Sequence, residues 1–203
     1  MYTSLQTLKS YILPRSLRGQ DEWDTLLQTI GKGVADQFDR HCNRRFRREE
    51  NATVEFGGEH MSYVLPHYPI ESVSLVETRD DPASAWEEYN DAIEQQSNSS
   101  GLIQFYSRLV SECDRIRVTY TGGYFVDLTG STEQPAGSIA LPGDITLAWF
   151  EQCAHVFEKK DKLGANFVAF ERKLGGALLP LLQTGLTDAV KEMLQGHKRY
   201  QLI

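Results

Sequence analysis

Residues 115–124 of the chain read Arg115-Ile116-Arg117-Val118-Thr119-Tyr120-Thr121-Gly122-Gly123-Tyr124. The first six are mostly β-branched or aromatic, which is typical of a strand, and the two glycines that follow are a turn signal. Similar short runs precede this one, with turn-forming residues between them, at 52–56, 61–65, 70–78 and 102–106. The sequence therefore predicts a small antiparallel β module built from hairpins, at about 52–126.

Helical patterns lie on both sides of this module. Residues 3–12 predict a short helix with Thr3 or Ser4 as N-cap, and apolar residues spaced by three and four predict a longer helix at 21–43. Downstream, Pro142 and Asp144 mark the start of a third helix, and Gly196 marks the end of a fourth. We place these two helices at 143–160 and 187–195.

The predicted fold class is α+β, with the chain 1–203 as a single domain. We expect a small helical bundle of three to four helices, formed by 1–48 and 141–200, with the antiparallel β module inserted between them. A long apolar loop is expected at 161–185, and loops of this length usually have a function. Its large apolar side chains have no evident partner within the segment, and they include Phe167, Phe170, Leu178 and Leu179.

Composition and charge narrow the function classes. With 203 residues, 40% hydrophobic and 24% charged, the chain can bury a core, and its net charge of -7 argues against a protein that coats nucleic acid. The charge is uneven along the chain. Residues 1–48 hold nine basic and five acidic side chains, residues 49–100 hold one basic and twelve acidic, and residues 101–203 hold eleven of each. The acidic block at 49–100 is either a solvated face or a surface with an electrostatic function.

Sequence signals for targeting and for catalysis are weak. No apolar run is long enough to span a bilayer, the first residues do not resemble a signal peptide, and we interpret Cys42, Cys113 and Cys153 as core thiols of a reducing compartment. Gly31-Lys32-Gly33 lies within a helical pattern, where a phosphate loop does not occur. His41-Cys42 and Cys153-Ala154-His155 place possible metal ligands near each other, but no second pair of ligands follows at the spacing of a zinc site. We expect no cofactor, no metal and no enzymatic activity.

The sharpest positive feature is a cluster of arginines at the end of the second predicted helix, consisting of Arg40, Arg44, Arg45, Arg47 and Arg48. If that helix continued, Arg40, Arg44 and Arg48 would share one face. Three interpretations stay open: favourable charge at a helix C-terminus, an ion-pair surface for a protein partner, or a phosphate contact.

The order of elements resembles the head-tail connector (adaptor) family of tailed bacteriophages. The resemblance covers about 1–157 and 186–200, and no single motif is strong by itself. It rests on the order and spacing of five stretches: Cys42-Asn43-Arg44-Arg45-Phe46, Pro69-Ile70-Glu71-Ser72-Val73-Ser74-Leu75-Val76, Arg117 to Tyr124, Leu141-Pro142-Gly143-Asp144-Ile145-Thr146-Leu147-Ala148, and Lys198-Arg199-Tyr200.

This resemblance implies a non-enzymatic virion protein at the head-tail interface, made in the cytoplasm of the host bacterium. Such a protein forms a ring, commonly of twelve copies, that binds the portal protein and the next neck or tail protein, has no membrane partner, and lets double-stranded DNA pass. A neutral or acidic lining would let the DNA slide, because it offers few phosphate contacts.

The resemblance also suggests which residues make contacts. We expect portal contacts from the arginine cluster and from the C-terminal tail, and subunit or channel contacts from the loop at 161–185. The tail residues concerned are His197, Lys198, Arg199 and Tyr200. Two alternatives stay open: a neck stopper or tail-completion protein, and a small cytosolic enzyme or binding module whose site the sequence does not reveal.

Overall fold

The computed structural model describes residues 1–57, 60–89, 93–105, 115–130, 132–159 and 185–199. The chain divides into two compact units. The helical unit comprises Met1–Phe38, Asp127–Thr132 and Pro142–His197, and the β unit comprises Asp39–Val126, Glu133–Leu141 and Lys198–Ile203. The predicted α+β class with a β module is confirmed. Residues 39–48 and 198–199, expected in the helical part, group with the β unit, and the single domain stays a prediction.

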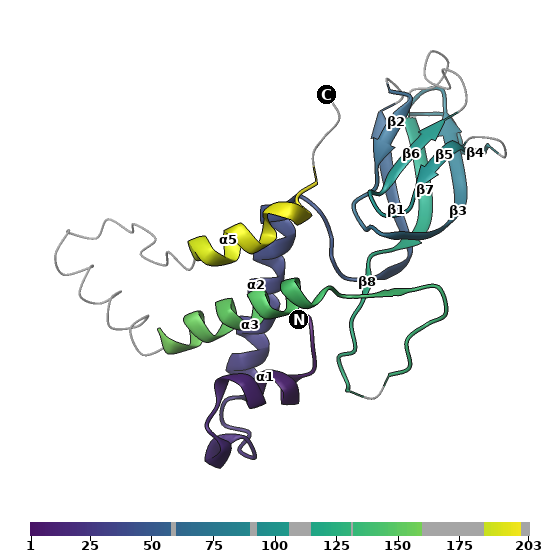
Figure 1. Cartoon of the computed structure of the whole chain (residues 1–203). Coiled ribbons are helices and arrows are strands. Elements are labelled where there is room, and N and C mark those ends of the chain that lie inside the picture. Colours follow the sequence, from purple (N-terminus) through teal and green to yellow (C-terminus); the bar gives the residue numbers. More distant parts are fainter. Residues whose placement is uncertain (58–59, 90–92, 106–114, 131, 160–184, 200–203) are drawn as a thin grey trace. The chain divides into compact units, whose positions relative to one another are not determined.

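Figure 1 shows the helices of the helical unit, and local capping chemistry marks the start of several of them. Ser4 caps α1 by accepting a hydrogen bond from the Thr7 amide at 3.2 Å, and Thr187 caps α5 in the same way. Proline precedes α3, and Asp144 lies in its first turn. The elements are α1 (Leu5–Ile12), a 3-10 turn (Arg15–Leu17), α2 (Asp24–Cys42), α3 (Gly143–Glu158), α5 (Asp188–Leu194) and a second 3-10 turn (Gln195–His197).

Two of these helices differ from expectation. Helix α2 begins at Asp24 rather than at residue 21, because the backbone first makes a turn in which the Asp24 amide bonds to the Asp21 carbonyl at 3.1 Å. Gly196, expected to end the last helix, lies inside the second 3-10 turn. The division between the two units falls within α2, after Phe38.

The core of the helical unit is built around Trp149 of α3. This side chain is fully buried, and its indole Nε1–H donates to the Gly31 carbonyl of α2 at 3.0 Å. The contact requires the small residue, since a Cβ at Gly31 would lie 2.9 Å from Trp149 Cζ2. The remaining fully buried side chains come from all four helices and include Leu8, Leu27, Ala148, Cys153, Val190 and Leu194.

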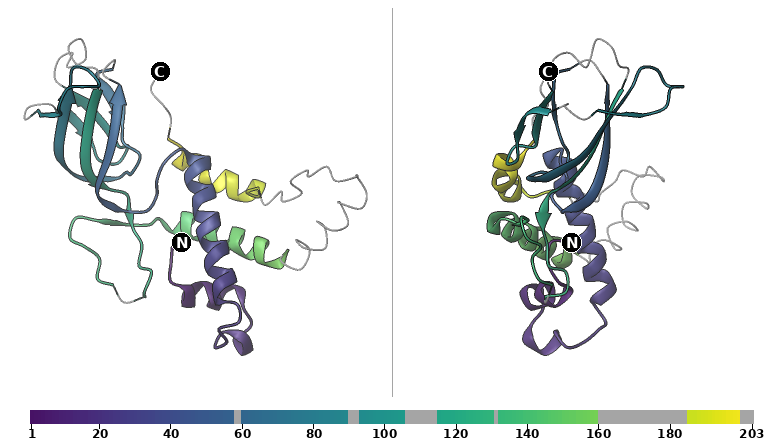
Figure 2. Two further views of the ribbon diagram at one scale, coloured as in Figure 1. Left: turned by 180° about the vertical axis from the view of Figure 1, so that it is seen from behind. Right: turned by 90° about the vertical axis from the view of Figure 1, so that its right-hand side faces the viewer.

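The β unit contains two antiparallel sheets where the sequence suggested one (Figures 1 and 2). The first has the order β1-β7-β3-β4 and the second the order β2-β6-β5, and a short parallel pair joins β8 to β9. The strands are β1 (Glu49–Gly57), β2 (Ser62–Val64), β3 (Ile70–Arg79), β4 (Glu87–Glu88), β5 (Ile93–Ser97), β6 (Leu102–Phe105), β7 (Arg115–Gly122), β8 (Tyr124–Phe125) and β9 (Ile139–Ala140).

One apolar cluster fills the space between the two sheets. Along β7, buried and partly exposed residues alternate, so Ile116, Val118 and Tyr120 point inward. Ile103 and Phe105 of β6 enter the same cluster from the second sheet. The predicted strands at 52–56, 61–65, 70–78, 102–106 and 115–120 are confirmed within a few residues.

Strands β4, β5, β8 and β9 were not predicted. Their residues are polar or few in number, as in Glu87-Glu88 and Ile93–Ser97, so no alternation marks them. They become strands because the fold brings backbone partners beside them: β4 pairs with β3, β5 with β6, and β8 with β9.

The glycine pair after β7 allows two other backbone segments to approach it closely. A Cβ at Gly122 would lie 2.4 Å from the His67 carbonyl oxygen, and one at Gly123 would lie 2.6 Å from that of Arg47. Gly123 also has a φ of +95°, which a residue with a side chain rarely adopts. The turn signal in the sequence thus marks a crossing point of three segments.

We predict opposite effects of alanine at two glycines of the same helix. Gly31→Ala will lower the free energy of unfolding by about 1–2 kcal/mol, because its methyl group meets the buried Trp149 ring. Gly33→Ala is the control: its Cβ meets nothing within 4 Å, so the higher helix propensity of alanine will raise stability by about 0.5–1 kcal/mol. Urea unfolding measures both, and stabilisation by Gly31→Ala would contradict the described packing.

Candidate functional site: an arginine-lined pocket

The arginine cluster lies on extended backbone and not on a helix. Helix α2 ends at Cys42, and Asn43 follows with a φ of +50°. Beyond it the Arg45 amide bonds to the Pro66 carbonyl at 2.9 Å, and the Arg48 amide to that of Tyr124 at 2.8 Å. The shared helix face considered for Arg40, Arg44 and Arg48 is therefore wrong, because tertiary backbone partners replace the next helical turn. Alternate residues from Asn43 to Arg47 are exposed and buried.

Arg44 is buried in a cage of aromatic rings. Only 4% of the residue is exposed, and its guanidinium carbon lies 3.3 Å from the centre of the Tyr68 ring, 4.6 Å from Phe46 and 5.3 Å from Tyr124. Its Nη2 donates to the Tyr68 carbonyl. Burial lowers the pKa of Arg44 and raises that of Tyr68, whereas the stacked rings stabilise the cation. Arg44 therefore holds the β unit together and is not a surface contact.

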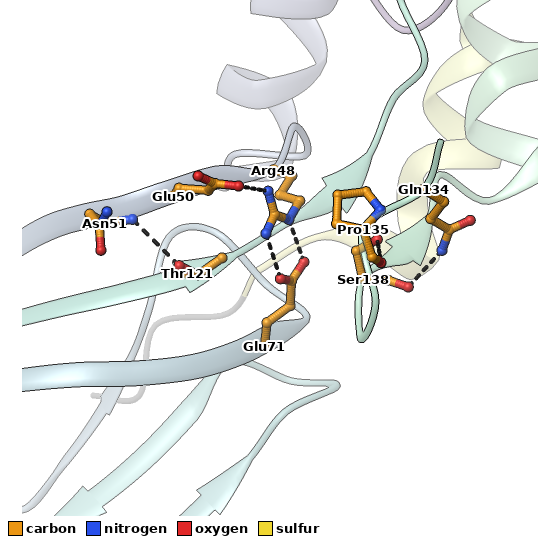
Figure 3. A network of polar contacts seen from close by, with 8 residues as sticks. All are labelled: Arg48, Glu50, Asn51, Glu71, Thr121, Gln134, Pro135 and Ser138. Carbon is orange, nitrogen blue, oxygen red and sulfur yellow. Dashed lines mark hydrogen bonds and ion pairs between the residues drawn. The ribbon is translucent and has the colours of Figure 1, made fainter. Parts of the chain in front are cut away.

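Arg48 also has internal partners (Figure 3). Its Nε and Nη2 donate to the two carboxylate oxygens of Glu71 on β3, at 2.7 and 2.9 Å, and Nη1 donates to Glu50 at 2.5 Å. The hydrogen bond to Glu71 is the main cause that raises the pKa of Arg48. The Arg48 and Glu71 side chains are only 16% and 12% exposed, so water screens this pair weakly.

Three arginines of the cluster remain exposed: Arg40, Arg45 and Arg47. Arg45 lies 3.5 Å from Asp39, a distant pair whose arginine side chain is 60% exposed. Exposed pairs of this kind contribute little to stability. These side chains are thus the members of the cluster that a partner can reach.

The exposed arginines border a pocket of about 300 Å³ within the β unit. It is lined by Asp39, Arg40, Asn43, Arg44, Arg45, Pro66 and Arg199. Four of these seven side chains are cationic and one is anionic. Electrostatically the pocket is therefore suited to an anion.

The sequence pointed to the arginines but not to the pocket. Arg199 reaches it from the C-terminal segment, which is fixed by a 2.8 Å hydrogen bond from the Arg199 amide to the Cys42 carbonyl. Burial lowers the pKa of Arg199, and its Nε has no hydrogen-bond partner among the described residues. Asp39, Asn43 and Pro66 carry no motif that distinguishes them, and only the tertiary fold brings them together.

The other predicted contact residues fall in two groups. In the tail, His197 Nε2 lies 2.8 Å from an Asp144 carboxylate oxygen in the helical unit, and Lys198 follows. Phe167, Phe170, Leu178, Leu179 and Tyr200 lie outside the described residues, as do Cys113 and most of the 161–185 loop. Cys42 and Cys153 are buried, and burial raises the pKa of Cys42 to about 11.

The described part of the chain shows neither a metal cluster nor a membrane-spanning helix. Within it, no three His, Cys, Asp or Glu side chains lie close enough to hold a metal ion. No helix in the same residues is both long and apolar enough to cross a membrane.

Removing Glu71 should destabilise the protein more than removing Glu50. Glu71→Ala leaves the poorly hydrated Arg48 without its bidentate partner, and we expect a loss of about 2–3 kcal/mol in the free energy of unfolding. Glu50→Ala is the matched control, because Glu50 is 65% exposed, and should cost less than about 0.5 kcal/mol. Chemical denaturation measures both, and equal effects would refute the special role of the Glu71 pair.

Lysine should not replace Arg44. Arg44→Lys keeps the charge but removes the planar group that stacks on Tyr68, so we expect a loss of about 2 kcal/mol in the free energy of unfolding. Arg45 is the exposed neighbour, so Arg45→Lys should change the free energy of unfolding by no more than about 0.5 kcal/mol. If thermal and urea unfolding show the two variants to be equally stable, the aromatic cage does not require a guanidinium.

Comparisons with known proteins find likeness in structure alone. No family model and no curated protein matches the sequence. A chain in the neck of an empty GTA particle, computed with C6 symmetry, aligns with 100% of this chain and 92% of its own length, at a TM-score of 0.60 and 11% identity. A chain in the virion of a native gene transfer agent (GTA) particle aligns with a TM-score of 0.61 and 12% identity, and the coverage of both chains is the same as in the first match.

A third match comes from the neck of the native GTA particle, computed with C12 symmetry. It covers 91% of this chain and 87% of that one, with a TM-score of 0.52 and 12% identity. At such identity the likeness establishes the fold and nothing more. The chain therefore has the fold of chains found in the necks of gene transfer agent particles.

Proposed function

We propose that this chain is a structural protein of the neck of a tailed-phage-like particle. One observation carries the proposal: the whole chain, and not one module of it, aligns with a chain in the neck of a GTA particle. The alignment also covers 92% of the neck chain, so the likeness extends over nearly the full length of that chain and is not limited to one shared module. In this role the protein needs no catalytic site, because it acts through the surfaces that contact its neighbours in the particle.

The proposal includes assembly into a ring. The necks with matching chains were computed with C6 and with C12 symmetry. A ring of twelve copies satisfies both symmetries, and identical head-to-tail contacts close such a ring. Each copy must then present two different surfaces that fit one another.

The finer role that we propose is that of an adaptor between the portal protein and the next neck or tail protein, with double-stranded DNA passing through the ring. The acidic block at 49–100 is consistent with passage, since it repels phosphate. We assign portal contacts to the tail from His197 onward, including Tyr200, and to the exposed Arg47. Phe167, Phe170, Leu178 and Leu179 remain proposed subunit or channel contacts.

Loss of the protein should give full heads that leak DNA and carry no tails. A strain in which the gene is deleted tests this by electron microscopy of its particles, with the intact gene supplied from a plasmid as the control. Intact, infectious particles without the protein would exclude a neck role.

The portal contact can be tested separately with a purified portal ring. The deletion should begin after Arg199, because His197 and Arg199 contact the body of the protein and their loss would disturb its fold. We expect removal of residues 200–203, combined with Arg47→Ala, to abolish co-sedimentation with portal rings while the circular dichroism spectrum stays unchanged. Unchanged co-sedimentation would refute the portal assignment, and binding to the tail-side protein instead would indicate a stopper.

A further inference from the structure

The arginine-lined pocket has more positive charge than its own residues neutralise. Among the described residues that line it, Asp39 is the single carboxylate, against four arginines. One Asp39 oxygen already accepts the Phe46 amide at 3.1 Å, and the other lies 3.5 Å from Arg45. Arg40 forms no ion pair with any described residue, and Nε of both Arg44 and Arg199 lacks a hydrogen-bond partner there. The described residues therefore leave the pocket with unneutralised positive charge, which an anion from a partner can balance.

The pocket suits a side-chain carboxylate better than a DNA phosphate. Its volume of about 300 Å³ leaves room for a glutamate side chain of a partner, and planar guanidinium groups pair with a carboxylate through two parallel hydrogen bonds. DNA binding instead requires basic residues spread along the backbone, because affinity grows with the number of phosphates neutralised. Here the neighbouring sequence is acidic, with twelve acidic side chains and one basic side chain at 49–100, and would repel a polyanion.

The chain itself carries carboxylates of the required kind. Glu87 and Glu88 form β4, which lies at the edge of the first sheet because it pairs only with β3. Both side chains are exposed, and neither forms an ion pair with another described residue. Charged side chains at an edge strand also hinder backbone pairing with another sheet, so a partner meets this edge through its carboxylates.

We propose that the arginine-lined pocket of one copy receives the Glu87-Glu88 edge of the next copy. This contact joins two different surfaces of the same protein, as a closed ring requires, and it rests on the ring in the proposed function. Complementary charge fixes which surfaces meet and speeds their encounter. Arg40, Arg45 and Arg199 thereby become subunit-contacting residues, and Arg47, which does not line the pocket, keeps its assignment to the portal.

Cross-linking in purified particles tests the contact. Copies that carry both Arg40→Cys and Glu88→Cys, treated with a short bismaleimide, should give a ladder of covalent dimers and higher oligomers. The two single variants are the controls, because Cys42 and Cys153 are buried and each control keeps every native cysteine. Particles that contain the double variant but give no ladder would overturn the contact while leaving the neck role intact. Particles made with the unmodified protein that nevertheless lack it would overturn the proposed function.

Charge exchange then distinguishes a carboxylate from DNA. Adding Arg45→Glu to the cross-linking variant should reduce the ladder about tenfold, and adding Glu87→Lys as well should restore it, since the exchanged charges attract again. Far-ultraviolet circular dichroism of each purified variant checks that the fold is retained. If Glu87→Lys fails to rescue, or if the ladder disappears once particles have lost their DNA, the pocket holds a phosphate and the proposal is wrong.

Discussion

Three backbone segments of the β unit meet where β7 ends, at separations that only hydrogen in place of a side chain permits. Gly122 lies against the His67 carbonyl and Gly123 against that of Arg47. Each contact is reinforced by hydrogen bonds, from the Gly123 amide to Pro69 at 2.9 Å and from the Tyr124 amide to Phe46 at 2.7 Å. The chain after α2 is therefore held against the sheet by its backbone. The positions of Arg44, Arg45 and Arg48 all depend on this crossing.

That crossing explains why one short run of arginines divides into side chains with internal partners and side chains that stay exposed. Side chains that face the sheet are used inside the unit: Arg44 in its aromatic cage and Arg48 on Glu71. Those that face away, Arg45 and Arg47, stay exposed. Successive side chains of an extended segment point to opposite sides, which separates the even-numbered arginines from the odd-numbered ones. A helix would have placed Arg44 and Arg48 on the same face as Arg40, as the sequence first suggested.

Sequence reasoning recovered the elements whose signal is local. The cap at Ser4, the start of α3 after Pro142 and the β-branched strands follow from neighbouring residues, and they were placed within a few positions. It failed where distant partners decide. Glu87-Glu88 is a strand only because β3 lies beside it, and α2 ends at Cys42 because Pro66 and Tyr124 provide backbone partners. The pocket was missed for the same reason, since Arg199 reaches it from the far end of the chain.

The Arg48–Glu71 pair gives the structure a different sensitivity to dissolved ions from that of Arg45 and Asp39. Counterions accumulate around exposed charges and weaken their attraction, over a Debye length of about 8 Å at physiological ionic strength. They have little access to a pair whose side chains are 16% and 12% exposed. In concentrated salt the join between the segment after α2 and strand β3 should therefore persist, whereas the charges on the pocket rim are screened. Ionic strength would then control association without loosening the fold.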